Sequence, residues 1–314
     1  MVRRRPFSRR PRRLRPRTAG AIGLAAGYAL DTVLGDPRRG HPVAAFGRAA
    51  AAVERRMWAD SRARGAAYLL ACAGTVTGLG ALAQVRTRGW TRVVATALAT
   101  WIVLGGRGLA TEGETMAGLL DDGDLPGARR RLSHLCGRDA TGLDAAELAR
   151  AATESIAENT SDAVVAPLLW GAVAGIPGLL GYRALNTLDA MVGHRSPRYA
   201  RFGWAAARAD DAANLLPARV TALVTVVLSG NPGRAWRIWR RDGARHPSPN
   251  AGQVEAAFAG ALGIRLGGVN SYGGRVEDRG VLGDGAAPSP AELRRAVRLS
   301  RAVGLAALAI AVLR

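Results

Sequence analysis

Residues 153–182 decide the fold of this chain. The stretch Thr153-Glu-Ser-Ile-Ala-Glu-Asn-Thr-Ser-Asp162 leads directly into residues 163–182, twenty residues that carry no charge. A helix of that length is enough to span the hydrocarbon core of a bilayer. The sequence therefore predicts a membrane helix with a group of acidic and polar residues at its N-terminal end.

The acidic residues of this stretch are spaced as one helical face. Glu154, Glu158 and Asp162 are four residues apart, so on a helix they form a single stripe. Stacked carboxylates repel, and lipid offers them no partner, so a cation, a positively charged substrate or arginines must stabilise them. A solvated helix end beside arginines is the common alternative. Because this stripe also carries hydroxyl and amide groups and abuts an apolar segment, we interpret it as a site.

Apolar and polar segments alternate along the rest of the chain. The 314 residues are 48% hydrophobic but only 5% aromatic, and 22% are charged. Mean hydropathy is still slightly positive, so the charge must be confined to loops. The other apolar windows are residues 18–35, 66–84, 93–106, 215–230 and 302–313. This pattern predicts an all-α, polytopic helical membrane protein with polar catalytic loops.

Several connections between these windows have a predicted form. Residues 45–64 have the pattern of an amphipathic helix that is basic on its polar side. The windows 66–84 and 93–106 are predicted to form a helical hairpin. Residues 143–157 are predicted to be the helix that delivers the acidic stripe, and residues 288–301 a short amphipathic helix before the last window.

The net charge of +20 is carried by arginine, because the chain contains no lysine. Nine arginines and no acid fall in residues 1–17. We interpret this arm as a disordered anchor on anionic lipid, and residues 18–314 as a single membrane-embedded catalytic domain. A cleaved secretory signal is the alternative, but no small-residue cleavage site closes the first window. Nucleic acid is not an expected partner, since interleaved aromatic residues and zinc-ligand spacing are missing.

A second acidic group lies at the start of another membrane window. Asp210-Asp-Ala-Ala-Asn214 places two acids and an amide within one helical turn, and such oxygen ligands suit Mg²⁺ beside a diphosphate. The simpler alternative is a helix N-terminus whose acids favour the helix dipole.

A third polar region combines an imidazole, an amide and many glycines. His246-Pro-Ser-Pro-Asn250 is an extended, proline-stiffened segment. The glycine-rich residues 260–285 that follow offer backbone N–H groups to an anion, with Arg265 and Arg275 as counter-charges. They contain neither a Walker A loop nor a dinucleotide-binding fingerprint. A flexible loop and a phosphate or cofactor loop are about equally supported.

Five separated motifs share their residues and order with one known family. They are Gly35-Asp-Pro with His41-Pro42, Glu154 to Asp162, Asn186 to Gly193, Phe202 to Asp211 with Asn214 and Pro217-Ala-Arg219, and His246 to Gly252 with Leu266-Gly-Gly268. This set resembles the CobD/CbiB family of integral-membrane cobinamide-phosphate synthases. The resemblance covers residues 20–312 and leaves the arginine-rich arm outside.

The resemblance implies a role in cobalamin biosynthesis. The family joins a propionate of adenosylcobyric acid to aminopropanol or to its phosphate, in an ATP-dependent amide ligation that gives adenosylcobinamide or its phosphate. ATP as co-substrate and Mg²⁺ as cofactor are then expected, and other cobalamin-biosynthesis enzymes could be partners. The protein would be a multi-pass protein of the cell membrane whose motif loops face the cytoplasm, because ATP and corrinoids are cytosolic.

The chemistry of such a ligation suggests roles for the motif residues. A carboxylate must be activated, as an acyl phosphate, while Mg²⁺ and arginines neutralise the transferring phosphoryl group. We predict as catalytic residues Glu154, Glu158, Arg208, His246 and Asn250. We predict as cofactor-binding residues Arg219, Arg265, Gly267 and Gly268. We predict as metal ligands Glu158, Asp162, Asp210 and Asp211.

Two other functions stay open. A Mg²⁺-dependent membrane transferase acting on a diphosphate substrate would use Asp210, Asp211 and Asn214. It would need a second acidic motif of matching form, which residues 154–162 supply only loosely. A membrane transport component would show broken helices and internal symmetry, and the chain has no visible repeat.

Overall fold

The computed structural model describes residues 14–37, 40–194, 196–272 and 275–313. The first helices are α1 (Pro16–Leu34), α2 (Pro42–Met57), α3 (Arg62–Arg86), α4 (Trp90–Val103), α5 (Gly106–Asp121) and α6 (Leu125–Leu132). The middle of the chain forms α7 (Ala145–Thr160), the π-helical turn η1 (Ser161–Val165), α8 (Ala166–Ala174), α9 (Ile176–Leu188) and a second π-helical turn η2 (Asp189–Gly193). The last part forms α10 (Trp204–Leu228), α11 (Pro232–Asp242), α12 (Ala251–Leu262), β1 (Leu266–Tyr272), β2 (Arg275–Leu282) and α13 (Pro290–Leu313).

The predicted all-α class is confirmed, with one small exception. The exception is the antiparallel pair β1–β2, which occupies much of the glycine-rich segment predicted as a loop. Most of the predicted N-terminal arm lies outside the described residues. Its last two residues, Pro16 and Arg17, already belong to α1.

The chain has the features of a membrane protein. Within the described ranges, four helical segments are long and apolar enough to cross a bilayer: Arg62–Arg86, Trp90–Asp121, Trp204–Leu228 and Pro290–Leu313. These segments also expose large apolar side chains, among them Leu70, Leu79, Val94, Leu223 and Leu305. Contiguous apolar surface on helices of this length is stable against lipid and unfavourable in water.

The uncharged residues 163–182 do not form one crossing helix, so that prediction is wrong. The chain breaks at Gly175, whose φ of 69° favours glycine, and Pro177 starts the next helix in its first turn. The Gln84 side chain caps the break. Its Oε1 accepts the Ile176 N–H at 2.9 Å, and its Nε2 donates to the Ala174 carbonyl at 3.4 Å. α8 and α9 therefore pack on each other as a helical hairpin that turns at Gly175, and neither belongs to the described segments that are long and apolar enough to cross a bilayer.

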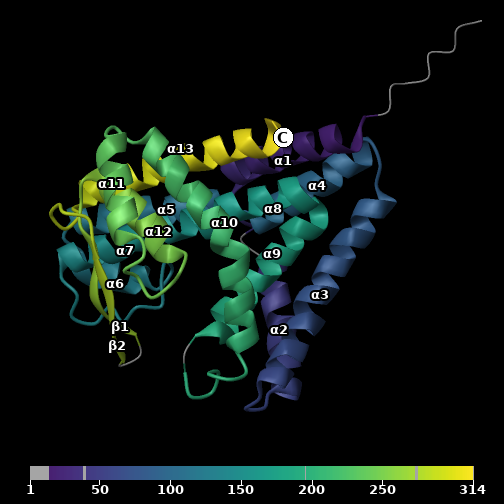
Figure 1. The fold of residues 1–314 in the computed structure, drawn as a ribbon, viewed down its shortest axis with the longest axis horizontal. Helices are drawn as coiled ribbons and strands as arrows, with labels where there is room; N and C mark the ends of the chain where they lie inside the picture. Colours follow the sequence, from purple (N-terminus) through teal and green to yellow (C-terminus); the bar gives the residue numbers. More distant parts are fainter. Residues whose placement is uncertain (1–13, 38–39, 195, 273–274, 314) are drawn as a thin grey trace, which may run out of the picture.

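Three other connections differ from the predictions. The predicted helix 45–64 is interrupted, because α2 ends at Met57 and the Ser61 hydroxyl caps the start of α3. α3 and α4 do not form the predicted packed hairpin: α4 lies along α1, and α3 packs mainly on α9 (Figure 1). Residues 288–301 and the last window form one continuous helix, α13.

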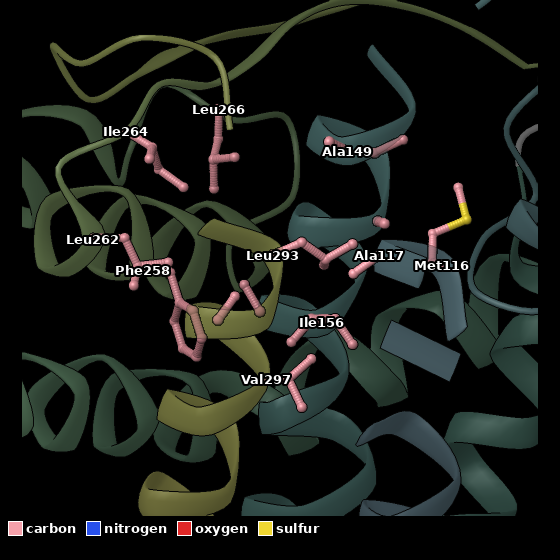
Figure 2. Packing of buried hydrophobic residues seen from close by; sticks show 14 of the residues in the cluster. Met116, Ala117, Ala149, Ile156, Phe258, Leu262, Ile264, Leu266, Leu293 and Val297 are labelled. Atoms are coloured by element: carbon pink, nitrogen blue, oxygen red, sulfur yellow. The ribbon is translucent and has the colours of Figure 1, made fainter. Parts of the chain in front are cut away.

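Two buried apolar clusters flank the acidic stripe. One joins α5, α6, α7, α12 and α13 and contains Ile156 and Phe258 (Figure 2). The other joins α1, α4, α8, α9 and α13 and contains Val164. Since Ile156 is on α7 and Val164 on η1, this continuous segment runs from one cluster into the other. The acidic residues between them are thus held on a well-packed element.

Candidate functional site

The acidic stripe ends in an irregular stretch of helix. Asp162 lies in the π-helical turn η1, and Asp189 begins the second such turn, η2. A π-helical turn is wider than an α-helical one and is frequent at functional sites, where it changes the direction of side chains. The charge of Asp189 acts on Asp162, so the two turns bring these acids near each other. Asp189 was not among the predicted site residues.

Glu154 is a buried carboxylate with arginine partners. It forms an ion pair with Arg138 at close range and a second one with Arg150 at 3.5 Å. Its Oε1 also accepts the Gly267 N–H at 2.7 Å. For Glu154, the alternative interpretation of the stripe, a carboxylate neutralised by nearby arginines, therefore applies. A catalytic role for Glu154 stays a prediction. Arg138 lies sixteen residues before Glu154 in a loop, where spacing gave no signal of the contact.

Glu158 has very different surroundings from Glu154. It is only partly exposed, and none of the described residues forms a hydrogen bond or ion pair with its side chain. Burial raises the pKa of Glu158, and the Glu154 carboxylate adds to the rise, while Arg279 and Arg138 lower it. Glu158 is thus a carboxylate held near opposite charges but not neutralised by direct contact.

His246 lies in the turn before α12 and is almost fully buried. Its Nδ1 accepts the Ser248 N–H at 2.9 Å, and its Nε2 lies 3.8 Å from Oε1 of Glu255. Burial and the nearby Arg279 charge lower the pKa of His246 to about 4. The ring is therefore neutral at pH 7, and because Nδ1 is an acceptor, its proton is on Nε2.

Asn250 connects α12 to α10. Its Nδ2 donates to the Asp211 carbonyl at 2.8 Å, and its Oδ1 accepts from Arg219 at 3.0 Å. The structure thus brings together two residues, Asn250 and Arg219, that were predicted from separate motifs. The other predicted arginine of α10, Arg208, is exposed and pairs with the Asp211 carboxylate at 3.8 Å.

Asp210 is the buried acid of its motif and is held by amides. Its Oδ2 accepts from Asn214 at 3.0 Å, and its Oδ1 accepts from Asn186 at 3.4 Å. The Tyr182 hydroxyl donates to Asn214 Oδ1 at 2.8 Å and lies 3.1 Å from the Asp162 carbonyl. This network links α9, α10 and η1.

Asp162, Asp189 and Asp210 together form an acidic cluster. Burial raises the pKa of Asp162, and the charges of Asp210, Glu158 and Asp189 raise it further. Burial, together with Asp210 and Asp211, raises the pKa of Asp189 to about 7. Carboxylates that raise one another's pKa in this way would be stabilised by a cation.

Mg²⁺ would fit this cluster only if water or a bound phosphate supplied some of its oxygen ligands. Among the residues that the structure describes, no three His, Cys, Asp or Glu side chains are arranged to hold a metal ion. Mg²⁺ in proteins often uses one or two carboxylates and takes its other ligands from water and phosphate. The carboxylates of Asp162 and Asp210 match that partial donor set. The predicted metal ligands stay predictions, and Asp211, paired with Arg208, lies apart from the amide network around Asp210.

The predicted loop residues Arg265, Gly267 and Gly268 line a cavity of about 290 Å³. Arg150 and the first turn of α7 complete its wall. Gly267 has a φ of 78°, and a Cβ there would lie 1.9 Å from the Gly280 carbonyl oxygen, so only glycine fits. The volume is at the lower limit of small-molecule pockets. Asp144 and Glu147 line the cavity beside the two arginines, so its charge is mixed, and cofactor binding stays a prediction.

Comparison with known proteins supports the motif resemblance. A family model described as CobD/Cbib protein matches residues 24–300. The chain belongs to the CobD/CbiB family. The relative from Mycobacterium tuberculosis strain H37Rv is 55% identical, over 93% of this chain and 95% of its own length. Relatives from Geobacter metallireducens and Rhodobacter capsulatus are 46% and 43% identical, each over 90% of this chain and more than nine-tenths of their own.

All three relatives are named cobalamin biosynthesis protein CobD. A role in cobalamin biosynthesis is therefore the part of the predicted function that these names support. No solved structure matches the chain.

Proposed function

We propose that this protein is the membrane enzyme of cobalamin biosynthesis that joins adenosylcobyric acid to aminopropanol or its phosphate in an ATP-dependent amide ligation. The observation that supports this proposal is that two kinds of group lie along one segment, α7–η1. The carboxylates of Glu158 and Asp162, which none of the described residues neutralises by an ion pair, lie in its C-terminal half. A cavity lies at its N-terminal half, lined by Arg150, Arg265 and Gly267 together with the carboxylates Asp144 and Glu147.

This arrangement suits the activation of a carboxylate. The carboxylate oxygen of the corrinoid attacks the γ-phosphorus of ATP, ADP leaves, and an acyl phosphate is formed. Arg150 and Arg265 would bind an anionic group of ATP or of the corrinoid at the cavity. Asp162 and Asp210 would hold Mg²⁺, which when bound supplies neutralising charge for the phosphates. Arg219, fixed by Asn250, offers a further cation beside α10.

The direct test measures the reaction in purified membranes from a host that makes no corrinoids. The membranes are incubated with adenosylcobyric acid, Mg-ATP and either aminopropanol or its phosphate, and the corrinoid products are identified by mass spectrometry. We expect the amide product with at least one amine, and none when ATP is omitted. Failure of both amines to yield an amide would reject the proposal.

One structural feature favours a second candidate, a transport component. The helix break at Gly175 between α8 and α9 is of the kind that such proteins use to build substrate sites. Uptake of a corrinoid into sealed vesicles, in the absence of any amide product, would support this alternative over the ligase.

A further inference from the structure

Glu255 is a fully buried carboxylate to which none of the described residues donates a hydrogen bond. It lies in α12, where its side chain is 0% exposed. In the described part of the chain, no donor reaches either of its oxygens. Leaving a carboxylate dry and unpaired is costly. Glu255 was missed by sequence reasoning because it lies among alanine, glycine and phenylalanine, and its isolation in that apolar run was the only signal.

The neighbours of Glu255 leave it uncompensated. Nε2 of His246 lies 3.8 Å from Oε1 of Glu255, and this nitrogen also lacks a hydrogen-bond partner among the described residues. Glu154 already has Arg138 and Arg150 as its partners. Arg279 acts on both Glu255 and Glu158 through its charge, but its guanidinium pairs with Glu277 at 3.4 Å. Two carboxylates, Glu158 and Glu255, thus remain available on facing helices.

We propose that the carboxylate of Glu255, together with that of Glu158, binds the ammonium group of the acceptor amine. This inference rests on the proposed ligase function and assigns the amine subsite within it. A primary ammonium offers three N–H donors, which match the unfilled acceptor positions of two carboxylates. His246, with its proton on Nε2, is a positioning residue that can donate to Glu255 once the carboxylate is ionised.

A metal ion fits this place less well than an ammonium group. The proton on Nε2 of His246 prevents that nitrogen from ligating a metal, because Nδ1 is already occupied by the Ser248 N–H. Glu154 is likewise held by its arginines. The protein itself would then supply only two carboxylates, fewer oxygen ligands than the octahedral coordination of Mg²⁺ requires.

The assigned subsite also gives the proton of the amine a destination. The bound ammonium transfers one proton to Glu255 and becomes a free amine. The nitrogen lone pair then forms the C–N bond to the acyl phosphate carbon. The C–O bond to phosphate breaks, and the phosphate leaves with that electron pair and takes the second proton from nitrogen. Glu255 afterwards releases its proton to solvent. Glu255 is therefore assigned as a catalytic base.

The test compares binding of a charged and a neutral ligand of the same shape. Purified full-length protein in detergent is titrated by calorimetry with 1-amino-2-propanol, with its phosphate, and with 1,2-propanediol. Wild type is expected to bind one or both amines and not the diol. Glu255→Gln should weaken amine binding at least tenfold, the scale of one charge-assisted hydrogen bond. Glu158→Gln should weaken it as well, whereas Glu114→Gln, in an ion pair with Arg294 far from these residues in the sequence, should bind normally.

Folding and function are separated by two further measurements. Glu255→Gln removes only a buried charge, so its thermal unfolding temperature should not fall below that of wild type. Amide formation by wild type with unchanged amine binding in folded Glu255→Gln would overturn this inference and leave the ligase function intact. Wild type that binds Mg²⁺ but no amine at Glu255 would also overturn it. Absence of amide formation in wild type would instead reject the ligase function.

Discussion

At the scale of single residues, Glu154 and Glu158 have opposite surroundings although they are one helical turn apart. Glu154 is closed off by Arg138, Arg150 and the Gly267 N–H, so its charge is fully used inside the protein. Glu158 has no such partner among the described residues. A charge that the protein does not compensate is available to a ligand, whereas a compensated one holds loops together. The two residues should therefore respond differently to the same substitution.

Glu158→Gln is expected to lower turnover about a hundredfold or more, the scale of losing one strong electrostatic contact at a reaction centre. If Glu158 also contributes to a Mg²⁺ site, raising Mg²⁺ should recover part of the loss by mass action. The measurement is amide formation over a Mg²⁺ series. Glu114→Gln is the control. Near-normal turnover of Glu158→Gln at low Mg²⁺ would show that the stripe is structural.

Glu154→Gln should act on stability first. The substitution removes the carboxylate charge from the buried ion pair of Glu154 with Arg138, and breaking a buried ion pair destabilises by about 3–5 kcal/mol. The thermal unfolding temperature of Glu154→Gln in detergent should therefore be well below that of Glu158→Gln. Equal unfolding temperatures for the two variants would contradict the assigned difference.

His246 gives the protein an acid-sensitive contribution to stability. The pKa of its ring is about 4 in the folded chain, against 6.5 as the usual value. As pH falls from 6.5 towards 4, the unfolded chain takes up a proton that the folded chain does not, so stability is lost over that window. The loss is at most about 3 kcal/mol. His246→Asn should flatten the dependence of unfolding temperature on pH between 6.5 and 4. An unchanged slope would contradict the buried, neutral state of the ring.

At the scale of elements, the sequence predicts where helices form better than it predicts where they break or what they contact. The acidic stripe, Asp210 and His246 could be found because each lies in a compact local motif. The break at Gly175 had a local signal, Gly-Ile-Pro, but its cap is Gln84, some ninety residues earlier. The ion pair of Arg138 with Glu154 and the placement of Glu255 near His246 depend on tertiary packing, which no local spacing encodes.

The pairing of α1 with α4 depends on two glycines spaced four residues apart. A Cβ at Gly23 would lie 2.5 Å from Thr96 Cβ, and one at Gly27 would lie 2.4 Å from Thr100 Cβ. Small residues at this spacing let two membrane helices approach closely. Both threonines are buried in the contact. This spacing was a readable signal that another helix approaches α1 closely, but it did not identify α4 as that helix.

Gly27→Leu should therefore separate α1 from α4 and destabilise the protein by about 1–3 kcal/mol or more, as overpacking does. Gly20→Leu is the matched control, because nothing lies within 4 Å of a Cβ at that position of the same helix. Thermal unfolding of both variants in detergent measures the difference. Equal destabilisation by the two substitutions would show that the close approach is unimportant.

At the scale of the whole molecule, the contacts of the site restrict how the chain can cross the membrane. Asn250 binds both Asp211 and Arg219, so the His246 turn lies beside the first half of α10. α12 also packs along α10. Asp36 and Asp162 both act on the charge of Arg183, whose pKa is lowered by burial. The four motif regions around Asp36, Glu158, Asp210 and His246 thus lie close together, although α10 is apolar enough to cross a bilayer between two of them.

We therefore expect α10 to be re-entrant or interfacial, with all four motif regions on the cytoplasmic side. Single cysteines at the exposed positions Ala44, Thr141, Ala212 and Ala244, in a chain lacking Cys72 and Cys136, test this beside the four regions. An impermeant thiol reagent applied outside intact cells should leave all four unlabelled. Arg88→Cys, in the connection after α3, should be labelled if α3 crosses the membrane. Labelling of Ala244→Cys from outside, with Ala212→Cys protected, would instead make α10 a full crossing and divide the proposed site between two compartments. A single ATP-dependent reaction centre could not accommodate that division.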